Sequence, residues 1–215
     1  MRPQYSITTQ PASEPITYAQ AADHLRVDST ADVQYITDLI PVAREYVDSI
    51  TGRASGQTTF KIIAASWQDL FEATSPDADT YLDPRYGSTT RPAQHQVIPL
   101  WRTPLISVSS VKYYAPSATS LTTMSSALYN VVTAAEPGRI QIPDSLPDVD
   151  ARIDAIQITF VAGSASSPAV SRHCVKMLVA HLYENRLPAV IGNIVNTIPF
   201  GLQELITNQK TGGFF

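Results

Sequence analysis

The sequence has little cysteine, little glycine and little charge, and each shortage limits what the protein can be. Cys174 is the single cysteine among 215 residues, which excludes an internal disulfide and any multi-cysteine zinc site. It lies in an apolar helical pattern, which predicts a buried, inert thiol rather than a nucleophile. Nine glycines stand against sixteen prolines, so we expect rigid connections between the elements.

Charged residues make up 16% of the chain, below the globular average of roughly 25%. The net charge of −4 argues against a nucleic-acid-binding protein that contacts phosphates through a basic face. No apolar run approaches the roughly 18 residues of a membrane span, and the start, MRPQYSITTQ, has no apolar signal-peptide region. We therefore expect a soluble protein made in a cytoplasm, with neutral surface available for protein–protein contacts.

Motifs of the common enzyme classes are also missing. The sequence contains no G-x-S-x-G elbow, no Walker A loop and no G-x-G-x-x-G fingerprint. His181 and Glu184 lie one helical turn apart, as metal ligands sometimes do, but no second ligand pair accompanies them. A structural histidine and an exposed glutamate are the better interpretation. We predict no catalytic residue, no metal ligand and no cofactor, and therefore not an enzyme.

An acidic cluster provides the main alternative to that prediction. Its members are Asp69, Glu72, Asp77, Asp79 and Asp83. Paired carboxylates can serve glycoside hydrolysis or bind calcium. The EF-hand spacing is absent, however, and Pro76 and Pro84 are typical of a solvated loop. A ligand-binding or hydrolytic domain that uses residues 69–83 is the less favoured function.

Helical patterns open the chain after a polar N-terminal arm, residues 1–14. Thr17 and Gln20 fit a capping box, with Ile16 and Ala21 placed as a hydrophobic staple, which predicts a short helix to about Val27. Apolar residues then recur at three- and four-residue spacing from Thr30 to Thr51, which predicts a longer amphipathic helix. Pro41 should kink this helix, and Gly52 suits the position after its end.

Strand patterns occupy the middle of the chain, residues 57–163. The predicted strands cover residues 59–62, 97–98, 108–114, 129–132, 139–142 and 155–161. Pro99 and Pro104 should confine the segment between them to a sheet edge or a connection. The sequence Glu136-Pro137-Gly138-Arg139 predicts a type II turn between two strands.

Helical patterns return at Ser167, a predicted cap with Pro168 at the first helical position. This helix should run to about Arg186, and a short final helix should follow from Pro199 to Ile206. The fold class is therefore α+β: a small helical bundle with an inserted antiparallel β region. Two N-terminal helices, one long C-terminal helix and one short one form the bundle. We predict a helical core of residues 15–56 and 164–215, the latter with a C-terminal tail, and a β insert of residues 57–163.

Five segments, taken in order, resemble the phage head–tail connector (adaptor) family, which also occurs in gene-transfer particles. They are Glu14–Thr17 leading to His24–Asp28, Ala43–Val47 leading to Thr51–Arg53, Ile98–Leu100 with Pro104–Val108, Val179–Arg186, and Ile198–Leu205. The set spans residues 14–206. Each motif alone is short, and the order makes the set specific.

The resemblance implies a structural protein of the virion neck, assembled in the bacterial host cytoplasm. Typical members form a ring, usually a dodecamer, below the portal. Such a ring extends the DNA channel and docks the stopper or tail protein, and genomic DNA passes through without sequence-specific binding. No cofactor and no membrane are implied. A stopper or a tail terminator is the closest alternative, although those proteins tend to be dominated by β-structure.

Three sets of contact residues are expected. By analogy with the family, the long helix would form ring contacts through Tyr35, Asp38, Arg44, Glu45 and Asp48. The C-terminal segment would reach the portal through Phe200, Leu202, Leu205, Ile206, Phe214 and Phe215. For Phe214 and Phe215 this expectation rests on the chemistry of their side chains alone, without a match to the family. In the loop of residues 72–96, which departs from the family, Tyr81 and Tyr86 would face the stopper or tail, with ordinary packing as an equal alternative.

Overall fold

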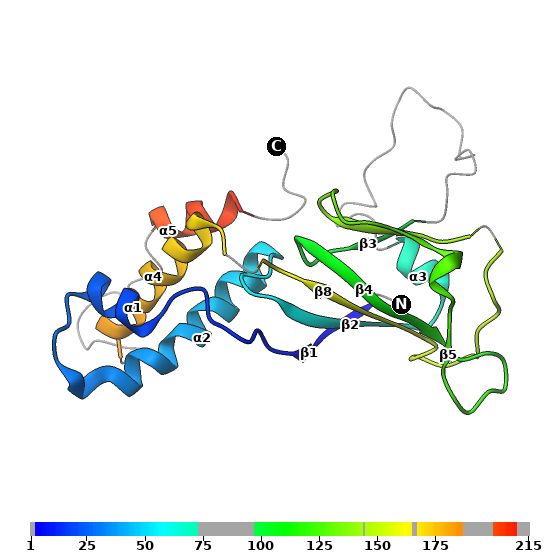
Figure 1. The fold of residues 1–215 in the computed structure, drawn as a ribbon, viewed down its shortest axis with the longest axis horizontal. Coiled ribbons are helices and arrows are strands. Elements are labelled where there is room, and N and C mark those ends of the chain that lie inside the picture. Colours follow the sequence, from blue (N-terminus) through cyan, green and yellow to red (C-terminus); the bar gives the residue numbers. More distant parts are fainter. Residues whose placement is uncertain (1–2, 73–96, 144, 165–166, 187–199, 210–215) are drawn as a thin grey trace, which may run out of the picture. The chain divides into compact units, whose positions relative to one another are not determined.

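The computed structural model describes residues 3–72, 97–143, 145–164, 167–186 and 200–209 (Figure 1). The chain divides into two compact units. The β unit comprises residues 1–10 and 58–162, and the helical unit comprises residues 11–57 and 163–215. No helix in the described ranges is long and apolar enough to cross a membrane.

The β unit contains a five-stranded antiparallel sheet (Figure 1). Its strands, in spatial order, are β1 (Gln4–Thr9), β2 (Thr58–Ala64), β8 (Ile156–Ala162), β4 (Leu105–Tyr113) and β5 (Thr122–Thr123). Buried and half-buried residues alternate along β2 and β8, as expected for strands that bury one face. Phe60 pairs with Phe160 across these strands, and their ring centroids are 5.5 Å apart.

A smaller antiparallel sheet lies in the same unit. It consists of β3 (Val97–Leu100), β7 (Gly138–Gln141) and β6 (Asn130–Val132), in that order. The helix α3 (Trp67–Glu72) and the 3-10 turn η2 (Ser126–Leu128) lie in the same unit. The strand β3 contains Pro99 and lies at a sheet edge, as predicted for a proline-containing strand.

The described part of the helical unit contains four helices and a 3-10 turn. They are α1 (Tyr18–Leu25), η1 (Thr30–Asp32), α2 (Val33–Thr51), α4 (Ala169–Glu184) and α5 (Phe200–Thr207). The apolar stripe of α2 packs against α4, with Ile36, Ala43 and Val175 fully buried in a shared core. The side chains of Leu202 and Ile206 on α5 enter the same core.

The mixed α+β class is confirmed, and so are several local predictions. Thr17 and Gln20 form both hydrogen bonds of the capping box at the start of α1. Gly52 follows α2 in the left-handed conformation, with a φ of 70°. Pro41 lies inside α2, which continues through it.

Two segments have more structure than their patterns indicated. Gln4–Thr9, within the predicted N-terminal arm of residues 1–14, is extended and pairs with β2, where it covers an edge that would otherwise be open. The segment predicted to be a loop from Asp69 begins as α3, and a capping box closes the start of this helix. The Ser66 hydroxyl accepts from the Asp69 amide at 3.2 Å, and the Asp69 carboxylate accepts from the Ser66 amide at 3.1 Å.

Two predicted turn and cap roles also fail. Gly138 has no positive φ, so it does not occupy the third position of a type II turn. It opens β7 instead, and glycine is required there because a Cβ would overlap the Leu105 side chain. Ser167 does not cap α4, because its hydroxyl donates to the carbonyl of Ser55 and Pro168 becomes the N-cap.

Candidate functional site

The described residues offer little chemistry for a reaction. No group of three or more His, Cys, Asp or Glu side chains in these ranges is arranged to hold a metal ion. Cys174 is 1% exposed in the helical core, and burial raises the pKa of its thiol, so the predicted buried thiol is confirmed. Asp77, Asp79 and Asp83 of the acidic cluster lie outside the described residues. The features left to consider are therefore surfaces.

The outer face of α2, defined here as Asp38, Val42, Glu45 and Tyr46, is the first such surface. Val42 is 54% exposed and Tyr46 is 38% exposed. These residues are exposed because the opposite side of the helix supplies the buried stripe against α4. Two carboxylates lie beside the apolar pair on the outer face, and one of them, Asp38, accepts a 2.8 Å hydrogen bond from Gln34.

Arg44, also predicted to lie at the ring interface, is 3% exposed and contacts three carboxylates of its own subunit. Its Nε lies 2.8 Å from Glu14, and its terminal nitrogens lie 3.4 Å from Glu45 and 3.8 Å from Asp48. Asp48 also accepts from the backbone amide of Ser55 at 3.1 Å. Arg44 and Asp48 therefore act inside the subunit in this structure, whereas Glu45 remains exposed.

Tyr35 belongs to a polar and aromatic cluster between η1, α2 and the end of α4. The Arg186 guanidinium lies 4.5 Å above the Tyr35 ring and 5.0 Å from the Tyr183 ring centroid. Asp32 accepts from the Tyr183 hydroxyl at 2.7 Å and from Arg186 at 3.0 Å. The Tyr183 hydrogen bond, with that of Arg186, lowers the pKa of Asp32, and the Asp32 carboxylate raises the pKa of Tyr183.

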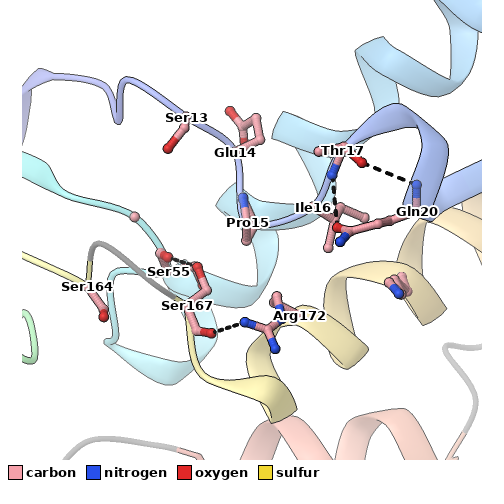
Figure 2. A pocket seen from close by; sticks show the side chains of 12 residues that line it. Ser13, Glu14, Pro15, Ile16, Thr17, Gln20, Ser55, Ser164, Ser167 and Arg172 are labelled. Atoms are coloured by element: carbon pink, nitrogen blue, oxygen red, sulfur yellow. Dashed lines mark hydrogen bonds between the residues drawn. The ribbon is translucent and has the colours of Figure 1, made fainter.

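A pocket of about 400 Å³ lies within the helical unit (Figure 2). We call it the α4 pocket. It is lined by the segment Ser13–Thr17 with Gln20, by Ser55 and Gly56, by Ser164 and Ser167, and by Arg172 and Lys176 of α4. Its walls come from four separate parts of the chain. The hydrogen bond from Ser167 to the Ser55 carbonyl, drawn in Figure 2, joins two of them.

Positive charge dominates the α4 pocket. Arg172 donates to the Ser167 carbonyl at 2.8 Å, and neither Arg172 nor Lys176 forms an ion pair with any residue that the structure describes. The start of α4 has no side-chain cap and no acidic residue in its first turn. Sequence reasoning missed this pocket. The available signal was two basic residues spaced by four in the first half of this helix.

The predicted portal-docking residues divide between core and surface. Leu202 is 0% exposed and Ile206 is 2% exposed, so both side chains belong to the helical core. Leu205, on the other side of α5, is 36% exposed. Phe200 begins α5. Phe214, Phe215, Tyr81 and Tyr86 lie outside the described residues.

The fold itself is a known one: a helical bundle beside an antiparallel β unit that is built from the N-terminal strand β1 and residues 58–162. No family model matches the chain, and no curated protein matches it. Solved structures do match the chain. A chain in the neck of an empty gene transfer agent (GTA) particle, computed with C6 symmetry, has a TM-score of 0.68 at 20% identity. A chain in the virion of the native GTA particle has a TM-score of 0.69 at 19% identity.

A third match is a chain in the neck of the native GTA particle, computed with C12 symmetry, with a TM-score of 0.63 at 18% identity. Each of the three alignments covers 99% of this chain and 97% of the other. At this level of identity the likeness shows a shared fold. It extends over both units of the chain.

Proposed function

We propose that this protein is a structural component of the neck of a tailed phage or gene-transfer particle, and specifically its head–tail adaptor. In this role a ring of copies sits below the portal, extends the DNA channel and docks the stopper or tail protein. Genomic DNA passes through this channel without sequence-specific binding. The role requires binding surfaces and no catalytic centre.

One observation carries the proposal: the fold matches chains of GTA necks and virions over 99% of its length. Partial matches are common when a widespread small fold recurs in unrelated proteins. A match that includes two units of different architecture, with the same insertion, is harder to obtain by chance. The five ordered motifs that resemble the adaptor family support the same role independently of the structure.

The symmetry of the matched particles supports a ring. The neck structures were computed with C6 and with C12 symmetry. A ring subunit obeying C12 symmetry is present in twelve copies or a multiple of twelve, so we expect a dodecamer. Closing such a ring requires head-to-tail contacts, in which each subunit offers two different complementary faces.

The outer face of α2 is our candidate for one of these faces. Val42 and Tyr46 place exposed apolar surface beside two carboxylates, a composition suited to an interface with a polar rim. Of the five residues predicted for the ring interface, Asp38 and Glu45 belong to this outer face. Leu205 is the described candidate for contact with the portal.

Electron microscopy and native mass spectrometry of the full chain test the proposal, with the protein alone and mixed with the portal protein of the same particle. We expect rings of twelve copies, or an added layer on the portal. Val42→Arg should prevent ring formation, whereas Leu128→Arg, at a site that is 56% exposed in the β unit, should not. A persistent monomer that ignores the portal would refute the adaptor role. Binding to the tail side of a preformed neck instead would indicate a stopper.

A further inference from the structure

The α4 pocket holds two positive charges that lack a counter-charge within the described chain. Arg172 and Lys176 are one helical turn apart, and like charges at this spacing repel each other. Arg172 lies in the first turn of α4, close to the positive end of the helix dipole, where cations are disfavoured. This arrangement is unfavourable in the isolated subunit. An anionic group entering the pocket would relieve it.

Among the residues that the structure describes, no carboxylate forms an ion pair with Arg172 or Lys176. Glu14 lines the pocket, but its Oε2 lies 2.8 Å from Arg44, with which it pairs instead. Serine hydroxyls and backbone groups supply much of the remaining lining. The pocket therefore combines two cations with polar hydrogen-bonding groups, which is the chemistry that receives a carboxylate.

The outer face of α2 carries the complementary charge. Asp38 and Glu45 are both exposed, and they are seven residues apart, so they lie on the same side of the helix. The α4 pocket and this outer face share no residue. They therefore meet the requirement of a head-to-tail ring for two different faces on each subunit.

We propose that the α4 pocket receives the outer face of α2 from the neighbouring copy in the ring, with Asp38 and Glu45 opposite Arg172 and Lys176. This inference rests on the adaptor function proposed above, and it assigns the second ring face. A DNA phosphate is the competing occupant for a basic site. Tracking a DNA backbone takes a basic stripe, however, whereas this site is a single concave pocket on a chain with a net charge of −4.

Charge reversal in the full-length chain tests the pairing. One variant carries Arg172→Glu and Lys176→Glu, a second carries Asp38→Lys and Glu45→Lys, and a third carries all four substitutions. Each double variant should raise the protein concentration needed for ring assembly by about tenfold or more, since like charges then face each other. The quadruple variant should return this concentration to near the wild-type value, because every interface again joins opposite charges.

Two controls separate loss of pairing from loss of folding or from a general charge effect. Lys112→Glu with Arg139→Glu, in the β unit, changes the net charge as much as the pocket double variant and should leave assembly unchanged. The neutral pairs Arg172→Gln with Lys176→Gln and Asp38→Asn with Glu45→Gln should weaken assembly in the same direction. Circular dichroism and the melting temperature verify that each variant is folded.

The outcomes distinguish the inference from the function on which it rests. If the wild-type chain forms no ring with or without the portal, the adaptor function fails. If rings form and the pocket double variant assembles as readily as the wild type, the pairing is wrong and the adaptor role stands. Failure of the quadruple variant to assemble would overturn the choice of α2 as the partner face. Intact rings with altered binding of double-stranded DNA would assign the pocket to DNA instead.

Discussion

The Nε atom of Arg44 lies 2.8 Å from Oε2 of Glu14, a residue 30 positions earlier in the chain. This contact ties the middle of α2 to the segment that leads into α1. The same guanidinium lies near Glu45 and Asp48, so a nearly buried cation is neutralised by three carboxylates. A buried charge is tolerated only when it is paired in this way.

Replacing Arg44 with methionine should therefore destabilise the helical unit. We expect a loss of about 3 kcal/mol, at the low end for breaking a buried ion pair, because Glu14 and Glu45 remain accessible to water. Urea unfolding measures this loss. The matched control is Glu45→Gln, which removes the most exposed partner and should cost under about 1 kcal/mol. Equal stability of Arg44→Met and the wild type would contradict the structural role.

Two leucines of α5 should behave differently. Leu202 is fully buried, so Leu202→Ala should cost about 3 kcal/mol through lost burial and a cavity. Leu205 is 36% exposed, and Leu205→Ala should cost under about 1 kcal/mol while weakening binding to the portal. Chemical denaturation and a portal-binding assay provide the two readouts. Equal stability losses in the two variants would mean that α5 does not pack as described.

The hydrogen bonds that Asp32 accepts should make part of the stability depend on pH. The pKa of this carboxyl is lowered below its ordinary 3.8 in the folded state, so the unfolded chain binds the proton more tightly. The contribution is therefore present above pH 3.8 and is lost as the pH falls further, through the folded-state pKa. The difference in melting temperature between the wild type and Asp32→Asn should be constant near neutral pH and shrink below pH 4. A difference that grows on acidification would contradict this assignment.

Two glycines should respond in opposite directions to replacement by alanine. Gly163 has a φ of +114°, and a Cβ there would overlap the carbonyl oxygen of Gly56. Gly163→Ala should therefore cost about 2 kcal/mol or more. Gly201 lies in α5 with nothing within 4 Å of its would-be Cβ, so alanine should stabilise by up to about 1 kcal/mol. Thermal unfolding of the two variants gives the comparison, and a neutral Gly163→Ala would mean that the backbone can move apart there.

Much of the fold could be predicted because its signals are local. The capping box at Thr17 uses residues three apart, and the stop at Gly52 depends on the conformation of one residue. The alternation along β8 and the apolar stripe of α2 repeat within a few residues. Such patterns specify the type of element before any distant contact forms. The ordered motifs likewise indicate a neck protein from the sequence alone.

The candidate site was less predictable, because its parts come from distant positions. The sequence by itself determined which elements form and that α2 has an exposed face with Asp38 and Glu45. Only the tertiary structure decided that Arg44 is buried, that Gln4–Thr9 closes a sheet edge, and that Ser167 bonds to Ser55, 112 positions away. The physical reason is that local patterns select helix or strand, whereas burial and hydrogen-bond partners depend on which surfaces meet. The α4 pocket exists only where four such segments converge.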